Sequence, residues 1–215
     1  LNTATTFADR LNQENYEGKP LNHWINCITL FPDYTTENHA FVHPSYLSAG
    51  INLRGVHALF SMISDQQILE SALYNNEKVY EKALKLFTQY DGLVIPVQGQ
   101  DWWYNRQHER QLTHTILNVL HHNADAARLC RNALTSIEKI QNSNTRGCLL
   151  EEKGEECVIR PGLQFAKDME HGSAADLLVS YMLYLFGGNG VSPSDQQQMQ
   201  SRLSGVYYFP YGSLL

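Results

Sequence analysis

Side chains that can transfer protons or hold hydroxyl and carboxylate groups gather in three short segments of the chain. The segments are "ENHAFVHPSY" (37–46), "QDWWYNRQHER" (100–110) and "FAKDMEHGSAAD" (165–176). Each combines several of the carboxylate, amide, imidazole and phenol groups used in acid–base chemistry and in ligand recognition. The three segments are therefore the first candidates for a functional site.

Three pairs of helices are predicted to position these segments, because apolar residues recur at helical spacing. The pairs are expected at about 45–89, 105–141 and 173–203, with a tight turn between the two helices of each pair. Ser64-Asp65, Asn123 and Ser192-Pro193 are expected to begin the second helices. Each polar segment then stands just before, or at the start of, the first helix of a pair.

The alternation of helix pairs and bridges predicts an all-α fold of repeated αα-hairpins, with short β-hairpin or extended bridges. Stacked hairpins place equivalent helix ends on one side, so we expect the three segments to converge on one surface. Helix N-termini offer free N–H groups and partial positive charge, which favour an anionic or hydroxyl-rich ligand. We expect residues 1–215 to form a single domain.

Composition narrows the classes of protein. The chain has 215 residues and a net charge of −6, which argues against nucleic-acid binding. We expect no membrane span, because no window approaches 18 consecutive apolar residues. Cys148 and Cys157 flank a predicted hairpin, where a disulfide and two free thiols both fit.

Neither a metal nor a cofactor is expected. The sequence has no CxxC pair and no phosphate-binding glycine loop after a strand. The stretch "HERQLTH" fails the zinc-peptidase pattern because His108 and His114 are six residues apart instead of four. We read His114 as a structural partner of a turn or a helix dipole.

The helix pairs, with Asn38-His39 and His43 before one helix and "GQDWWYNRQHE" (99–109) before the next, resemble the (α/α) toroid carbohydrate-active enzymes. Within that group the chain resembles the heparinase II/III-like and alginate-lyase-type polysaccharide lyases. The resemblance implies a carbohydrate substrate and an incomplete toroid, since three helix pairs make about half of six. It also implies a secreted or periplasmic protein, and it leaves the oligomeric state open.

The resemblance assigns roles to individual residues. Asn38 and His39 would hold a uronate carboxylate, and Tyr46, Tyr104 or His108 would transfer the proton. Arg106 would hold a second acidic group. The remaining substrate-binding candidates are Glu37, His43, Trp102, Trp103, Glu109, Glu170 and His171.

Two alternatives to β-elimination stay open, although elimination is slightly preferred. Inverting glycosidases use two carboxylates about 6.5–9.5 Å apart, and Asp101 could act with Glu37, Glu109, Asp168 or Glu170 in this way. The other alternative is a non-catalytic helical-repeat module that binds a protein or a sugar.

Overall fold

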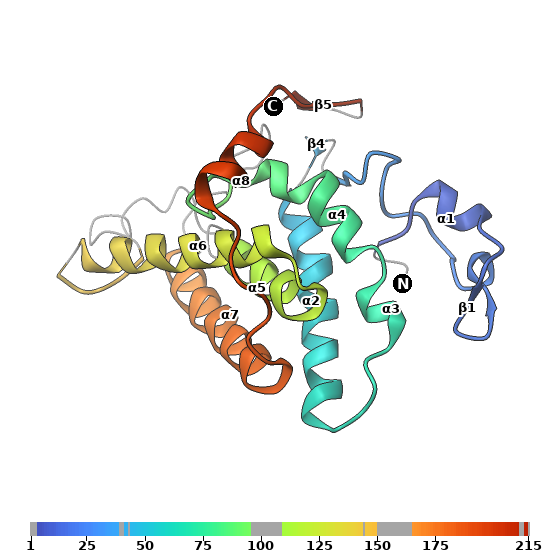
Figure 1. The fold of residues 1–215 in the computed structure, drawn as a ribbon, viewed down its shortest axis with the longest axis horizontal. Coiled ribbons are helices and arrows are strands. Elements are labelled where there is room, and N and C mark those ends of the chain that lie inside the picture. The colour runs from blue at the N-terminus through green and yellow to red at the C-terminus, as the bar shows by residue number, and fades with distance from the viewer. Residues whose placement is uncertain are drawn as a thin grey trace. The chain divides into compact units, whose positions relative to one another are not determined.

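The computed structural model describes residues 4–38, 41–42, 44–95, 109–143, 145–149, 165–210 and 213–214, and these are predominantly helical (Figure 1). The all-α class predicted from the sequence is thereby confirmed. The chain divides into two compact units. Unit 1 contains residues 1–87, 97–100 and 202–215, and unit 2 contains residues 88–96 and 101–201.

Unit 1 is built around one long helix, α2 (Pro44–Ile63). The other elements are α1 (Phe7–Leu11), η1 (Leu21–His23), α3 (Glu70–Leu73), α4 (Asn76–Lys82), η2 (Leu84–Phe87), and the strand pairs β1 (Asn15–Tyr16) with β2 (Lys19–Pro20), β3 (Glu37–Asn38) with β4 (Phe41–Val42), and β5 (Tyr208–Phe209) with β6 (Ser213–Leu214). Every strand pair is antiparallel.

The core of unit 1 forms where α2 meets the helices that follow it. Ile51, Ala58 and Leu59 of α2 are buried, and α2 contacts α3 and η2. Phe87, at the end of η2, is fully buried and stacks on Phe209 with ring centroids 4.9 Å apart. This apolar contact holds η2 against β5 inside the unit.

The helix predicted from 66 to 89 is wrong, because the segment folds as α3, α4 and η2. The breaks fall where the backbone adopts positive φ, +52° at Asp65 and +56° at Asn75. Asn75 is held there by its side chain, whose Nδ2 donates to the Ala4 carbonyl (2.8 Å) and to Asp9 Oδ2 (3.1 Å). Asparagine tolerates this conformation better than most residues do.

Unit 2 packs α5 (Glu109–His121) against both α6 (Ala124–Asn142) and α7 (Phe165–Gly187). Asn123 begins α6 as predicted, because its Oδ1 accepts the N–H of Ala126 at 2.9 Å. The predicted start of the last helix is wrong. Helix α8 (Gln196–Leu203) begins three residues beyond Pro193, and the Asp195 carboxylate accepts the N–H of Gln198.

Two further expectations stay predictions. The toroid of repeated hairpins is not tested by helical content alone, and neither is the single domain.

Among the described residues, no helix has the length and apolar character needed to span a membrane. The choice between a disulfide and two free thiols at Cys148 and Cys157 is not tested, because Cys157 lies outside the described residues.

Candidate functional site

Many of the predicted site residues lie outside the described part of the chain. These are His39, His43, Asp101, Trp102, Trp103, Tyr104, Arg106 and His108. For Asn38 and Glu109 the structure gives the place of the backbone, in β3 and at the start of α5. Their proposed roles therefore stay predictions.

Glu170 and His171 do not stand before a helix, as the sequence analysis expected. They lie inside α7, which begins at Phe165. The Glu170 carboxylate accepts the backbone N–H of Leu149 and so anchors the chain that follows α6, whereas His171 is exposed. The interaction seen for Glu170 is a structural one within unit 2.

Within the segment 37–46, β3 pairs with β4 in antiparallel fashion, and α2 begins at Pro44. Glu37 pairs with Val42 and Asn38 with Phe41, so the polar residues of β3 lie beside β4. Pro44 then opens α2, at a helix position where its missing N–H costs nothing. Tyr46 lies in the first turn of α2 and is 44% exposed. The structure therefore brings Glu37, Asn38 and Tyr46 into one local element of unit 1.

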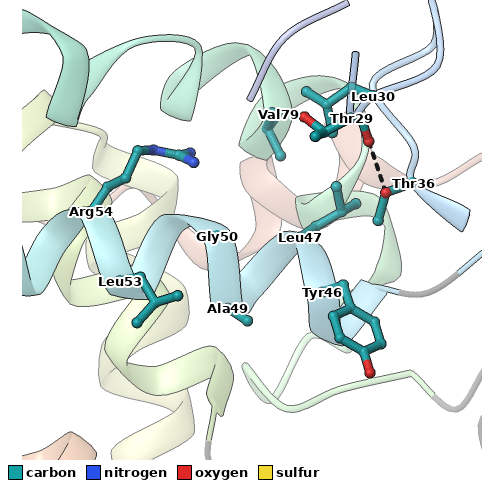
Figure 2. A pocket seen from close by; sticks show the side chains of 10 residues that line it. All are labelled: Thr29, Leu30, Thr36, Tyr46, Leu47, Ala49, Gly50, Leu53, Arg54 and Val79. Atoms are coloured by element: carbon teal, nitrogen blue, oxygen red, sulfur yellow. Dashed lines mark hydrogen bonds between the residues drawn. The ribbon is translucent and has the colours of Figure 1, made fainter. Parts of the chain in front are cut away.

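A pocket of about 230 Å³ lies against α2 (Figure 2), and we call it the α2 groove. It is lined by Thr29, Leu30, Thr36, Tyr46, Leu47, Ala49, Gly50, Leu53, Arg54 and Val79. Figure 2 shows Ala49 and Gly50 on α2 between Tyr46 and Leu53, and they are the smallest residues that line the groove. From Tyr46 to Arg54 the groove follows about 12 Å of helix.

The loop side of the α2 groove is fixed by threonine residues. The hydroxyl of Thr36 donates to the carbonyl of Thr29 at 2.9 Å, the contact drawn in Figure 2. This bond joins two parts of the connection that precedes β3. The groove therefore has a defined polar edge beside the apolar side chains of Leu47 and Val79.

Arg54 is the charged residue among those that line the α2 groove. Its side chain is buried, and Nε and Nη2 both donate to Asn76 Oδ1, with Nε at 2.9 Å. Asn76 in turn donates to the Ala72 carbonyl at 3.0 Å. Burial lowers the pKa of Arg54 to about 10, so the guanidinium remains a cation at neutral pH.

The residues of the α2 groove can act on a ligand in three ways. Tyr46 offers an exposed phenol, Arg54 a buried positive charge about 12 Å further along α2, and Leu47 and Val79 an apolar surface. In a site of low dielectric a fixed cation attracts an anionic group more strongly than it does in water. The groove therefore suits a ligand that carries hydroxyl groups and a negative charge.

The sequence analysis identified Tyr46 but missed Arg54, Thr29 and Thr36. Arg54 carried a readable signal, since it is the single Asp, Glu, Lys or Arg residue in the helix from Pro44 to Ile63. The threonines carried none, because they come from a connection without helical or strand periodicity. Over the residues that the structure describes, no three His, Cys, Asp or Glu side chains are grouped to hold a metal ion.

The chain matches no protein-family model, and no curated protein or solved structure is significantly similar to it. The assignment of a function therefore depends on the residues and geometry of the chain itself.

Proposed function

We propose that this protein is a carbohydrate-active enzyme of the (α/α) toroid type that degrades an acidic polysaccharide by β-elimination. The observation that carries the proposal is the α2 groove, which has the exposed phenol of Tyr46 and the cation Arg54 on one helix. The strand pair β3–β4, with Glu37 and Asn38, precedes the same helix. The predominantly helical fold also supports the proposal, because α5 and α6 form a helix pair joined by the short turn His122-Asn123.

Elimination from a uronate requires three tasks. A base removes the proton from C5, the C4–O bond breaks as the C4–C5 double bond forms, and the departing oxygen receives a proton. The neighbouring carboxylate must be stabilised, because negative charge develops on it as the C5 proton leaves.

In this proposal Tyr46 removes the C5 proton as the base and then returns a proton to the departing oxygen as the acid. A positioned side chain can serve in both roles. Asn38 and His39 stabilise the carboxylate on C5 beside Tyr46, and Arg54, about 12 Å further along α2, attracts the acidic group of another sugar unit. Thr29 and Thr36 form the polar edge along which the hydroxyl groups of the sugar lie. No cofactor takes part in these steps.

The experiment is an incubation with polysaccharides that contain uronate and with neutral ones of matched length. Elimination produces an unsaturated uronate that absorbs in the ultraviolet, and we expect this signal from uronate polymers only. New reducing ends without the absorbance would replace the proposal with hydrolysis by Asp101 and a second carboxylate. If neither signal appeared, the non-catalytic binding module would be favoured instead.

A further inference from the structure

A second cavity, of about 400 Å³, lies in unit 2 against α6, and we call it the α6 cavity. It is lined by Asn118, Ala127, Cys130, Arg131, Leu134, Thr135, Glu138, Tyr184, Asn189, Val191 and Pro193. Its volume falls within the roughly 300–1,000 Å³ of ordinary small-molecule sites. None of its residues belongs to the site predicted from the sequence.

The floor of the α6 cavity is held by a buried amide. Asn118 is only 3% exposed; its Oδ1 accepts the N–H of Val191 (2.9 Å), and its Nδ2 donates to Tyr184 Oη (3.0 Å). Gly190, at φ +64°, passes so close that a Cβ there would lie 2.4 Å from Asn118 Oδ1. The connection between α7 and α8 is thereby fixed on α5, and the cavity has a defined shape.

Tyr184 presents a hydrogen-bond donor at this floor. Its oxygen accepts from Asn118, so its own proton is left for another acceptor. Within the protein, the Cys130 sulfur lies 3.7 Å away and is a weak acceptor. Burial raises the pKa of Tyr184 to about 12, so the phenol keeps its proton at neutral pH.

The rim of the α6 cavity carries both signs of charge. Arg131, Thr135 and Glu138 follow one another at helical spacing on one face of α6, and Asn189, from the connection between α7 and α8, also lines the cavity. In the described part of the chain, the Arg131, Glu138 and Asn189 side chains form no ion pair or hydrogen bond with protein groups. They are therefore available to a ligand.

We propose that the α6 cavity binds a small sugar acid, a molecule with one carboxylate and several hydroxyl groups. Arg131 pairs with the carboxylate, and Tyr184 donates to a hydroxyl oxygen. Glu138 and Asn189 accept hydrogen bonds from further hydroxyl groups, while Leu134 and Val191 pack on the C–H face of the ring. This site stands on unit 2 alone and does not depend on the function proposed for the α2 groove.

The test is a calorimetric titration of the whole chain with D-glucuronate, with D-glucose as the matched neutral probe. We expect glucuronate to bind and glucose to bind at least about tenfold more weakly, since a hydrogen-bonded charge contributes about 1.5–3 kcal/mol. Arg131→Gln should weaken glucuronate binding by a similar factor. Arg10→Gln, the same change at an exposed arginine of unit 1, should leave it unchanged.

The Tyr184→Phe variant separates the hydroxyl contact from the charge. It keeps the ring that lines the cavity but removes the donor, so it should weaken the binding of both sugars and leave their ratio close to that of the unmodified chain. Equal affinity for glucuronate and glucose would overturn the proposal. Glucuronate binding that is the same in Arg131→Gln and Arg10→Gln would also overturn it, because the anion would then be held elsewhere.

Discussion

Helices α2 and α5 distribute polar and apolar residues in opposite ways. From Arg110 to Val119, α5 is buried throughout, although it includes Gln111, His114 and Asn118. By contrast, α2 is mostly apolar but leaves Leu53 69% and Phe60 64% exposed. Side-chain polarity alone therefore does not decide which helix is buried.

The difference shows that partners determine burial. Gln111 accepts from Ser180 at 3.1 Å, Thr115 lies 3.3 Å from the Cys130 sulfur, and Asn118 donates to Tyr184. Because α6 and α7 supply these groups, the polar side of α5 loses little by leaving water. On α2 the corresponding contact is between Arg54 and Asn76, and the rest of its buried side is largely apolar.

The largest expected effect on stability concerns the loop at Gly92, which contacts both α5 and α6. Gly92 has φ +86°, its carbonyl meets His114 Nε2 at 3.1 Å, and a Cβ would lie 2.2 Å from the Leu129 carbonyl oxygen. Gly92→Ala should lower the free energy of unfolding by about 3 kcal/mol or more, through backbone strain and the clash with α6. Chemical denaturation measures this.

Gly188→Ala is the matched control for that variant. Gly188 has nearly the same φ, +85°, but no atom within 4 Å of a Cβ. It should lose only about 1–2 kcal/mol, the cost of the left-handed conformation. Equal losses in the two variants would show that the contact between this loop and α6 contributes nothing to stability.

Adjacent residues of α2 provide the next comparison. Leu59 is 4% exposed and Phe60 is 64% exposed. Leu59→Ala should cost about 2–5 kcal/mol because it leaves a cavity in the core, whereas Phe60→Ala should stay within about 0.5 kcal/mol. Urea denaturation of both variants measures the difference. A large loss from Phe60→Ala would mean that the outer side of α2 is covered in solution.

The buried His114 of α5 predicts a dependence of stability on pH. Burial and the nearby Arg110 lower the pKa of His114 to about 3. Below the unfolded pKa of about 6.5 the unfolded chain binds a proton that the folded chain does not, so stability falls as pH falls. The loss is about 1.4 kcal/mol per pH unit, or about 2 kcal/mol between pH 6.5 and 5.

The measurement is the free energy of unfolding against pH for the unmodified chain and for His114→Gln. The variant carries no titrating group at this position, so the difference between the two curves isolates the contribution of the histidine. Curves that run parallel from pH 7 to pH 4 would contradict a buried, neutral His114.

The smallest expected effect lies at the start of α6, which covers α5. Asn123→Ala removes the acceptor for the Ala126 N–H and should cost about 1 kcal/mol. Asn142→Ala, at the exposed far end of the same helix, should change stability by less than about 0.5 kcal/mol. Thermal denaturation of the pair would show no difference if the cap did not contribute.

The sequence predicted well those features that depend on local pattern. Apolar spacing placed α2 from about residue 45 to 63, and Asn123 was identified as the cap of α6. The break at Asn75 was missed because it depends on Ala4 and Asp9, which are distant in sequence.

The burial of polar residues was the other feature that the sequence analysis did not predict. His114 was interpreted as a partner of a turn or a helix dipole, but it is fully buried against the Gly92 carbonyl. The signal that could have helped is the polar stripe Gln111, Thr115 and Asn118, whose spacing of four and three places them on one face of α5. Its partners on α6 and α7 could not be known from periodicity, because periodicity does not identify which helices pack together.

The most direct test of the central claim, that the α2 groove is part of a site for elimination, is a comparison of two tyrosine variants on a uronate polysaccharide. We predict that Tyr46→Phe lowers the rate of unsaturated product formation by about 10²–10⁴-fold, the contribution of a general acid–base group. Tyr181→Phe, the same change at a tyrosine of α7 that is 66% exposed, should keep the rate of the unmodified chain. Equal rates in Tyr46→Phe and Tyr181→Phe would contradict the account.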